Sequence, residues 1–209
     1  MTKRKRFLKG TAVVLSVVLA LLVGVAGTLA YLMDSTDSVV NTFTSSDVNI
    51  TLEETGAVNN AKSFKMVPGA TIEKDPKITV SADSEDCYVF VKIEKSAVLT
   101  DYIDYDVASG WSELVGASTD TYDVYYCTVT DEQANKGVAI PVLAGTTEYP
   151  NGAVTVLDTV EKEDMEKLKV SGATQPTLTF TAYAIQLNNL PTGTDAAGAW
   201  ALINPPAAG

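Results

Sequence analysis

The stretch from Thr28 to Glu54 constrains this chain most, because it joins the end of a membrane-length apolar run to the first clear β-strand. The apolar run, Thr11 to Leu29, has no charged residue, and about 19 apolar residues are nearly enough to span a bilayer. It follows a start with five lysines and arginines and no acid. A basic segment, an apolar segment and a small-residue boundary predict a secretory signal peptide over residues 1–30.

The predicted cleavage follows Ala30, with Thr28 and Ala30 at the −3 and −1 positions and Tyr31 as the new N-terminus. The alternative is a segment that stays in the membrane as an anchor. Cleavage leaves ten basic and 26 acidic residues on 179 residues, a net charge of −16. Such a charge disfavours contact with nucleic acid and with anionic lipid. We therefore expect no nucleic-acid partner, and a membrane contact only before cleavage.

The chain after the signal is predicted to be mostly β. Val48, Ile50 and Leu52 alternate with polar residues, which is the period of a half-buried strand. Further β-branched and aromatic runs, separated by turn residues such as Pro68-Gly69, lie at 77–82, 87–95, 122–130, 138–143, 153–157 and 177–187. Because no βαβ rhythm occurs, we expect a jelly-roll-like antiparallel β-sandwich, forming one domain over residues 31–204 with a flexible tail at 205–209.

Two short helices are predicted to interrupt the strands. Asp158 is placed to cap a helix from Thr159 to Leu168, with Glu161 three residues further on. A second helix is predicted from Asp195 to Ile203, with Trp200 buried as a core anchor. Between these regions and the early strands, Asp101 to Asp123 is predicted to be an elaborated loop that holds a short strand near Trp111.

Cys87 and Cys127 are the only two cysteines. An even number in an exported chain permits one disulfide, and both lie in strand-like runs that could be neighbours in one sheet. Two buried thiols that act as small apolar side chains fit the sequence equally well. Spacing along the chain does not report the distance between the two Cβ atoms, so both alternatives stay open.

Three short blocks around the signal boundary are similar to those of a known group of exported proteins: Gly27–Asp34, Val40–Thr44 and Val48–Leu52. They resemble the signal region of the TasA/camelysin-like family, whose members depend on the signal peptidase SipW. Later blocks of the same resemblance follow in order at Lys65–Gly69, Lys74–Pro76, Cys87–Lys92, Thr181–Gln186 and Ala199-Trp200. The resemblance implies a single TasA-like β-sandwich that is secreted to the extracellular matrix or cell surface as a relative of a biofilm matrix fibre protein.

The resemblance also implies a mode of assembly, in which the N-terminal strand of one subunit completes the jelly roll of the next. We expect the donor in residues 31–47, with the strand itself from Tyr31 to Thr44; its apolar residues are Tyr31, Leu32, Val39, Val40 and Phe43. Main-chain hydrogen bonds to an exposed sheet edge hold such an added strand, and a head-to-tail contact propagates. The expected partners are copies of the chain or other matrix proteins, and the signal peptidase during export. The alternative is a first strand paired within its own chain.

The chain has no histidine, which excludes a His-based triad and every zinc site that uses histidine. Camelysin-like relatives are described as metallopeptidases, so a peptidase function is the less favoured alternative. We expect no enzymatic activity, no catalytic residue and no cofactor. Asp83, Glu85 and Asp86 supply oxygens of the kind that Ca²⁺ takes. Without EF-hand spacing around them, they favour a solvated turn, and no metal site is expected.

A third alternative is a monomeric secreted binding module for polysaccharide or for another surface protein. Tyr102, Tyr105 and Trp111 lie in the elaborated loop and offer an aromatic stacking platform for such a ligand. Aromatic residues in loops more often hold the loop against the core.

Overall fold

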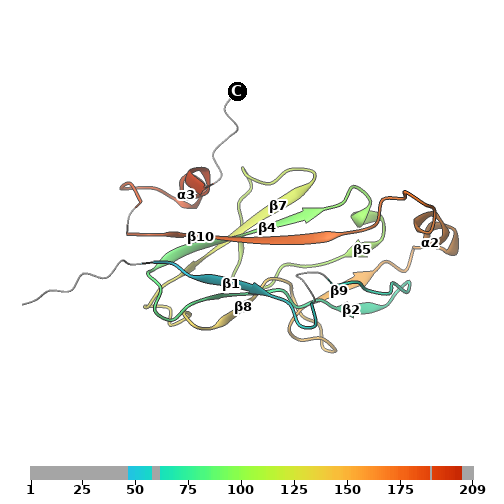
Figure 1. Cartoon of the computed structure of the whole chain (residues 1–209), viewed down its shortest axis with the longest axis horizontal. Helices are drawn as coiled ribbons and strands as arrows, with labels where there is room; N and C mark the ends of the chain where they lie inside the picture. Colours follow the sequence, from blue (N-terminus) through green and yellow to red (C-terminus); the bar gives the residue numbers. More distant parts are fainter. Residues whose placement is uncertain (1–46, 58–61, 189, 204–209) are drawn as a thin grey trace, which may run out of the picture. The chain divides into compact units, whose positions relative to one another are not determined.

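The computed structural model describes residues 47–57, 62–188 and 190–203 (Figure 1). The described part of the chain is mostly β, with three antiparallel sheets and two short α-helices. The predicted signal peptide with its cleavage residues Thr28, Ala30 and Tyr31, the donor residues up to 46 and the tail at 205–209 lie outside the described residues.

The strands form one four-stranded and two three-stranded sheets. The four-stranded sheet has the order β10 (Leu178–Gln186), β4 (Cys87–Lys95), β7 (Tyr122–Val129), β6 (Ser112–Glu113). One three-stranded sheet has the order β1 (Ile50–Glu53), β3 (Lys77–Val80), β8 (Ala139–Pro141). The other has the order β2 (Thr71–Glu73), β9 (Ala153–Val156), β5 (Ile103–Asp104). A 3-10 helix, η1 (Leu99–Asp101), precedes β5.

The alternation of β4 divides the interior into two clusters. Cys87 and Val89 are fully buried on one face, with Val91 and Ile93, in a cluster that includes Ile78 of β3. Phe90 lies on the other face and packs on Trp200, with ring centroids 5.3 Å apart. Each fully buried aliphatic or aromatic side chain contributes about 1.5–3 kcal/mol. The predicted strand at 87–95 is confirmed, and it contributes side chains to both clusters.

The helices agree with the sequence pattern only in part. Helix α3 (Ala196–Ile203) begins one residue later than predicted, ends where predicted, and buries Trp200, which is 7% exposed. Helix α2 (Lys162–Leu168) begins three residues later than predicted, so Asp158 does not cap it. Its N-cap is Glu161, whose backbone N–H donates to Asp164 Oδ2 at 3.1 Å. The reason is Val160, which is buried, so residues 158–160 form a turn that packs this side chain instead of starting the helix.

Candidate functional site

A groove of about 1130 Å³ lies between the end of β1 and the start of β10. Figure 1 shows these two strands running alongside each other, although no ladder joins them. The lining from β2, η1, β5 and β9 is apolar and consists of Ile72, Leu99, Ile103 and Val154. Leu52 of β1 and Phe180 of β10 line the groove on either side, and Phe64 and Met66 join them. The groove therefore offers apolar surface beside two strands.

The edge of β10 that faces away from β4 has no strand partner in the described part of the chain. Ser96 N–H donates to the carbonyl of Thr177 at 3.0 Å, and this pair continues the register of the β10–β4 ladder. Bonded and non-bonded pairs alternate in an antiparallel ladder, so Thr179 bonds to β4 as well. Leu178 and Phe180 then direct their backbone N–H and C=O groups outward, and every second residue after them does the same. This row of groups can pair with an added strand.

Strand β1 is also an edge strand, because β3 is its one neighbour among the described strands. Leu52 and Glu53 of β1 and Leu178 to Phe180 of β10 all line the groove, and the two strands lie close to each other there. An extended segment that pairs with one of these edges has backbone partners along one side and apolar side chains next to it. The arrangement fits a β-strand better than a compact small molecule.

A buried ion pair interrupts the apolar lining. Lys74 Nζ lies 2.9 Å from Glu54 Oε2, and the two side chains are 11% and 15% exposed. The ammonium also lies over the rings of Phe64 and Phe180, at 5.3 and 5.1 Å from their centroids. Glu54 Oε1 is buried and has no hydrogen-bond partner. The neighbouring Asp75 shows no such lack, because it accepts from the backbone N–H and the hydroxyl of Thr55 at 3.1 and 2.6 Å.

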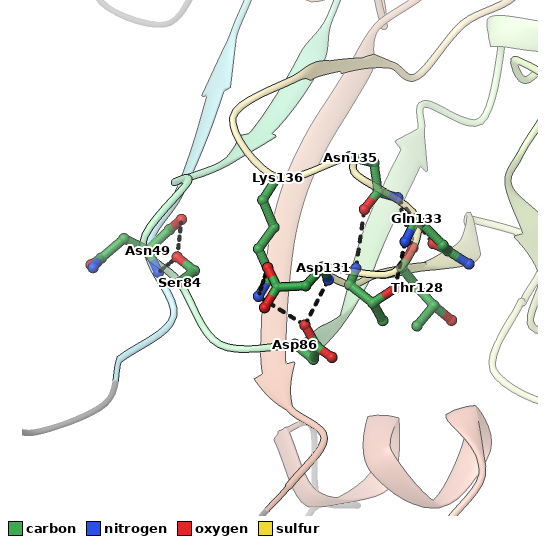
Figure 2. A network of polar contacts seen from close by, with 9 residues as sticks. Asn49, Ser84, Asp86, Thr128, Asp131, Gln133, Asn135 and Lys136 are labelled. Atoms are coloured by element: carbon green, nitrogen blue, oxygen red, sulfur yellow. Dashed lines mark hydrogen bonds and ion pairs between the residues drawn. The ribbon is translucent and has the colours of Figure 1, made fainter.

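The other end of β1 is closed by hydrogen bonds, which Figure 2 shows in part. Asn49 N–H donates to Ser84 Oγ at 3.1 Å, and Ser81 N–H donates to the Asn49 carbonyl at 2.9 Å. Glu85 N–H donates to the carbonyl of Asp47 at 3.3 Å. Residues 47–49 therefore continue the direction of β1 away from the groove. At a rise of about 3.3 Å per residue, Asp47 lies about 20 Å from the groove end of β1.

Lys136 ties two loops together beside this end (Figure 2). Its Nζ lies 2.8 Å from Asp86 Oδ1 and 2.9 Å from Asp131 Oδ1, and its side chain is 8% exposed. Asp131 N–H also donates to Asp86 Oδ1 at 3.0 Å. The hydrogen bonds from Lys136 and from the Asp131 backbone lower the pKa of Asp86. This carboxylate, one of the three oxygen donors considered for Ca²⁺, is thus engaged within the protein.

The other two candidates for Ca²⁺ lie in the same turn. Asp83 is exposed and Glu85 is half-buried. Within the described residues, no group of three or more histidine, cysteine, aspartate or glutamate side chains could hold a metal ion.

The two cysteines lie on the adjacent strands β4 and β7 as free thiols. Cys87 is opposite Val129 and Cys127 is opposite Val89, so the cysteines are diagonal neighbours. Diagonal positions are about 7–8 Å apart, which exceeds the usual Cα separation of a disulfide. Burial raises the pKa of Cys87 to about 11 and that of Cys127 to about 12. Both thiols are therefore poor nucleophiles at neutral pH and act as core side chains.

The three loop aromatics are used inside the protein and do not form an exposed platform. Tyr102 is buried, and its hydroxyl lies 3.2 Å from the carbonyl of Asp164. Burial, with the nearby Asp123 carboxylate, raises the pKa of Tyr105. Tyr105 and Trp111 both pack against the cluster around β4, and Trp111 Nε1 donates to the Pro141 carbonyl at 2.8 Å. These contacts favour a role in holding the loop.

Comparisons with known protein families, with curated proteins and with solved structures found no match for this chain. The likeness to TasA/camelysin-like proteins therefore stays a prediction that rests on short blocks of sequence. Among the described residues, no helix is long and apolar enough to cross a membrane.

Proposed function

We propose that this chain is an exported structural subunit of the extracellular matrix or cell surface, which assembles into fibres by donating its N-terminal strand. In this proposal, residues 31–44 of one copy lie in the groove of the next copy and complete a jelly-roll-like β-sandwich there. The observation that carries the proposal is the edge of β10 without a strand neighbour, beside a groove whose lining includes apolar side chains. Other matrix proteins with a similar strand are the second class of partner.

An edge without a strand neighbour among the described residues favours association, because the outward N–H and C=O groups from Leu178 to Ala184 can pair with an added strand. A donated strand pairs with these groups and covers the half-buried side chains Leu52, Ile72 and Phe180. At about 25 cal/mol per Å² of apolar area, such burial adds to the main-chain bonds. The run from Val39 to Phe43 supplies apolar, β-compatible side chains for this contact.

The placement of the two ends of β1 favours insertion of the N-terminal strand into the groove of another copy over its return to the groove of its own chain. Residues 47–49 are held in line with β1 and lead away from the groove, so a segment before them must reverse direction to return. A second copy needs no reversal. Because donor and acceptor are different surfaces, the contact is heterologous and propagates into a filament.

Removal of the signal peptide is the step that permits assembly in this proposal. Signal peptidase cleavage after Ala30 frees the donor from the membrane, and the uncleaved chain keeps it tethered. The groove carries Lys62, Lys74 and Lys77 against Glu53 and Glu54. This local excess of lysine attracts a donor that contains Asp34 and Asp37, although the mature chains repel one another through their acidic net charge.

The test is made in the mature chain from Tyr31, by removing single backbone N–H groups of β10 through substitution with proline. Leu178→Pro removes an outward N–H and leaves the β10–β4 ladder intact, so we expect a folded protein that no longer forms filaments. Leu178→Ala retains the N–H and controls for the lost side chain; it should still assemble. Thr179→Pro removes an inward N–H instead, and should lower the melting temperature. Sedimentation and negative-stain microscopy report assembly, and circular dichroism reports the fold.

Mixing two defective chains tests the head-to-tail geometry. Phe43→Asp disables the donor, and Leu178→Pro disables the acceptor. Each variant alone should stay monomeric, whereas the mixture should form dimers that grow no further, because each dimer uses the one intact groove and the one intact donor. Light scattering measures the size. If the wild-type mature chain stays monomeric across salt and pH, strand donation is wrong and a secreted binding module becomes the leading function.

A further inference from the structure

Residues 62–66, between β1 and β2, have the burial pattern of a strand but belong to no ladder. Lys62, Phe64 and Met66 are half-buried and line the groove, whereas the residues between them are exposed. No backbone N–H or C=O group of residues 62–66 bonds to another described residue. One face of this segment therefore lies in the groove, and side chains alone hold it there.

The contacts that hold the segment come from Lys62 and Phe64. Lys62 Nζ donates to the carbonyl of Thr55 at 2.8 Å and lies over the Phe64 ring, 5.0 Å from its centroid. The Phe64 centroid is 5.3 Å from Lys74 Nζ, which is itself 5.1 Å from the centroid of Phe180 in β10. Phe64 thus shares one ammonium with a side chain of the edge strand. Single contacts of this kind are weak where water reaches them.

The end of the segment next to β2 is fixed more firmly, by a tight turn at Pro68-Gly69. Ala70 N–H donates to the Val67 carbonyl at 3.0 Å, and Gly69 has a φ of 73°, which favours glycine. Gly69 N–H donates to the carbonyl of Val156 in β9 at 3.0 Å. The backbone is therefore anchored from Gly69 onward, whereas residues 62–66 can leave the groove without breaking a backbone hydrogen bond to the described chain.

We propose that residues 62–66 are a strap, which covers the start of the β10 edge in the free subunit and moves aside when a strand is added. This inference rests on the proposed function and concerns the regulation of the same groove. A strand that pairs with β10 lies about 4.8 Å from it. Because Phe64 and Phe180 flank one ammonium, the strap and the added strand need the same space.

The two competitors for this space differ in how they are held. The strap has side-chain contacts only, whereas an added strand forms a row of main-chain hydrogen bonds with β10 and covers apolar side chains. A strand that fits the groove displaces the strap, and a brief encounter with an unrelated chain does not. Covering an edge with a loop is a general protection against unwanted pairing. The strap therefore raises the concentration at which filaments begin to grow.

Loosening the strap tests this regulation in the mature chain. Lys62→Met removes the bond to Thr55 and the cation above Phe64, and should lower the critical concentration about threefold or more. Lys65→Met removes the same charge from the exposed side of the strap, and should leave the critical concentration near the wild-type value. Sedimentation measures this concentration, and thermal melting checks that each variant is folded. A critical concentration that rises in Lys62→Met, or that changes equally in both variants, overturns the strap.

Thiol labelling follows the movement itself. Met66→Cys places a thiol on the groove side of the strap, and Val67→Cys places one at its exposed neighbour. The rate of maleimide labelling, read by mass spectrometry of the peptide that holds the new thiol, should rise several-fold at position 66 when filaments form and change little at position 67. A thiol at position 66 that reacts no faster in filaments overturns the strap, although assembly itself stands. A wild-type chain that never forms filaments refutes the proposed function.

Discussion

The two ends of β1 differ in how completely their polar groups are paired. At the Asp47 end, the backbone of residues 47–49 bonds to the loop that follows β3, and Lys136 joins two carboxylates beside it. At the Glu54 end, two strand edges are free, the lining is apolar and one carboxylate oxygen is unpaired. The polar groups at the Asp47 end are paired within the chain. At the Glu54 end, the described residues leave some polar groups without a partner.

This difference separates stability from function. Changes at the paired end should lower the stability of the monomer and leave assembly unaffected. Changes at the outward edge of the groove should do the opposite. The ion pair of Lys74 and Glu54 is an exception to this rule. It lines the groove but is also buried in the free chain, so a change to it should affect stability as well.

The largest effect on stability is expected from Lys74→Met. This change leaves Glu54 as a buried charge with neither oxygen satisfied, and breaking one side of a buried pair costs about 3 kcal/mol or more. The free energy of unfolding should be measured by urea titration on the Leu178→Pro background, so that assembly does not contribute. Lys77→Met, at the rim of the same groove, is the control and should cost much less. Equal costs for the two variants indicate that the ion pair is hydrated.

Ser84→Ala addresses the paired end and should have a smaller effect. Ser84 is buried, and its loss leaves the backbone N–H of Asn49 without an acceptor, at a cost of about 1–2 kcal/mol. Its neighbour Ser81 uses only backbone groups in this contact, so Ser81→Ala should be nearly neutral. Both variants should form filaments at the wild-type concentration. A loss of filaments in Ser84→Ala contradicts the separation of the two ends, because it places this contact in assembly.

Most of the strands could be predicted because they are long enough to show a period. Strand β4 alternates over nine residues, and its two faces lie in the two buried clusters. Strands β2 and β5 could not be predicted, because three and two residues show no period and depend on pairing with β9. The predicted start of α2 was wrong because it also depends on packing. A capping pattern at Asp158 does not reveal that Val160 is buried.

The groove was largely hidden from the sequence. Glu54 and Lys74 are 20 residues apart, and Phe180 comes from the opposite end of the chain, so only the fold brings them together. The one local signal is Lys74-Asp75-Pro76, in which two charged residues are buried. The donor residues could be proposed from their apolar pattern, whereas the free edge that receives them depends on which strand has no neighbour.

The smallest effect is expected from pH, and it concerns the paired end alone. The pKa of Asp86 is lowered in the folded chain by hydrogen bonds from Lys136 and from Asp131 N–H. A lowered pKa means that this contact stabilises the fold above the unfolded value of about 3.9, and that the contribution is lost as pH falls through the folded value. Asp86→Asn should therefore lower the melting temperature at pH 7 and lower it less near pH 3. The exposed Asp83→Asn is the control. An equal shift at both pH values shows that the charge of Asp86 contributes nothing, and that hydrogen bonds alone hold the two loops together.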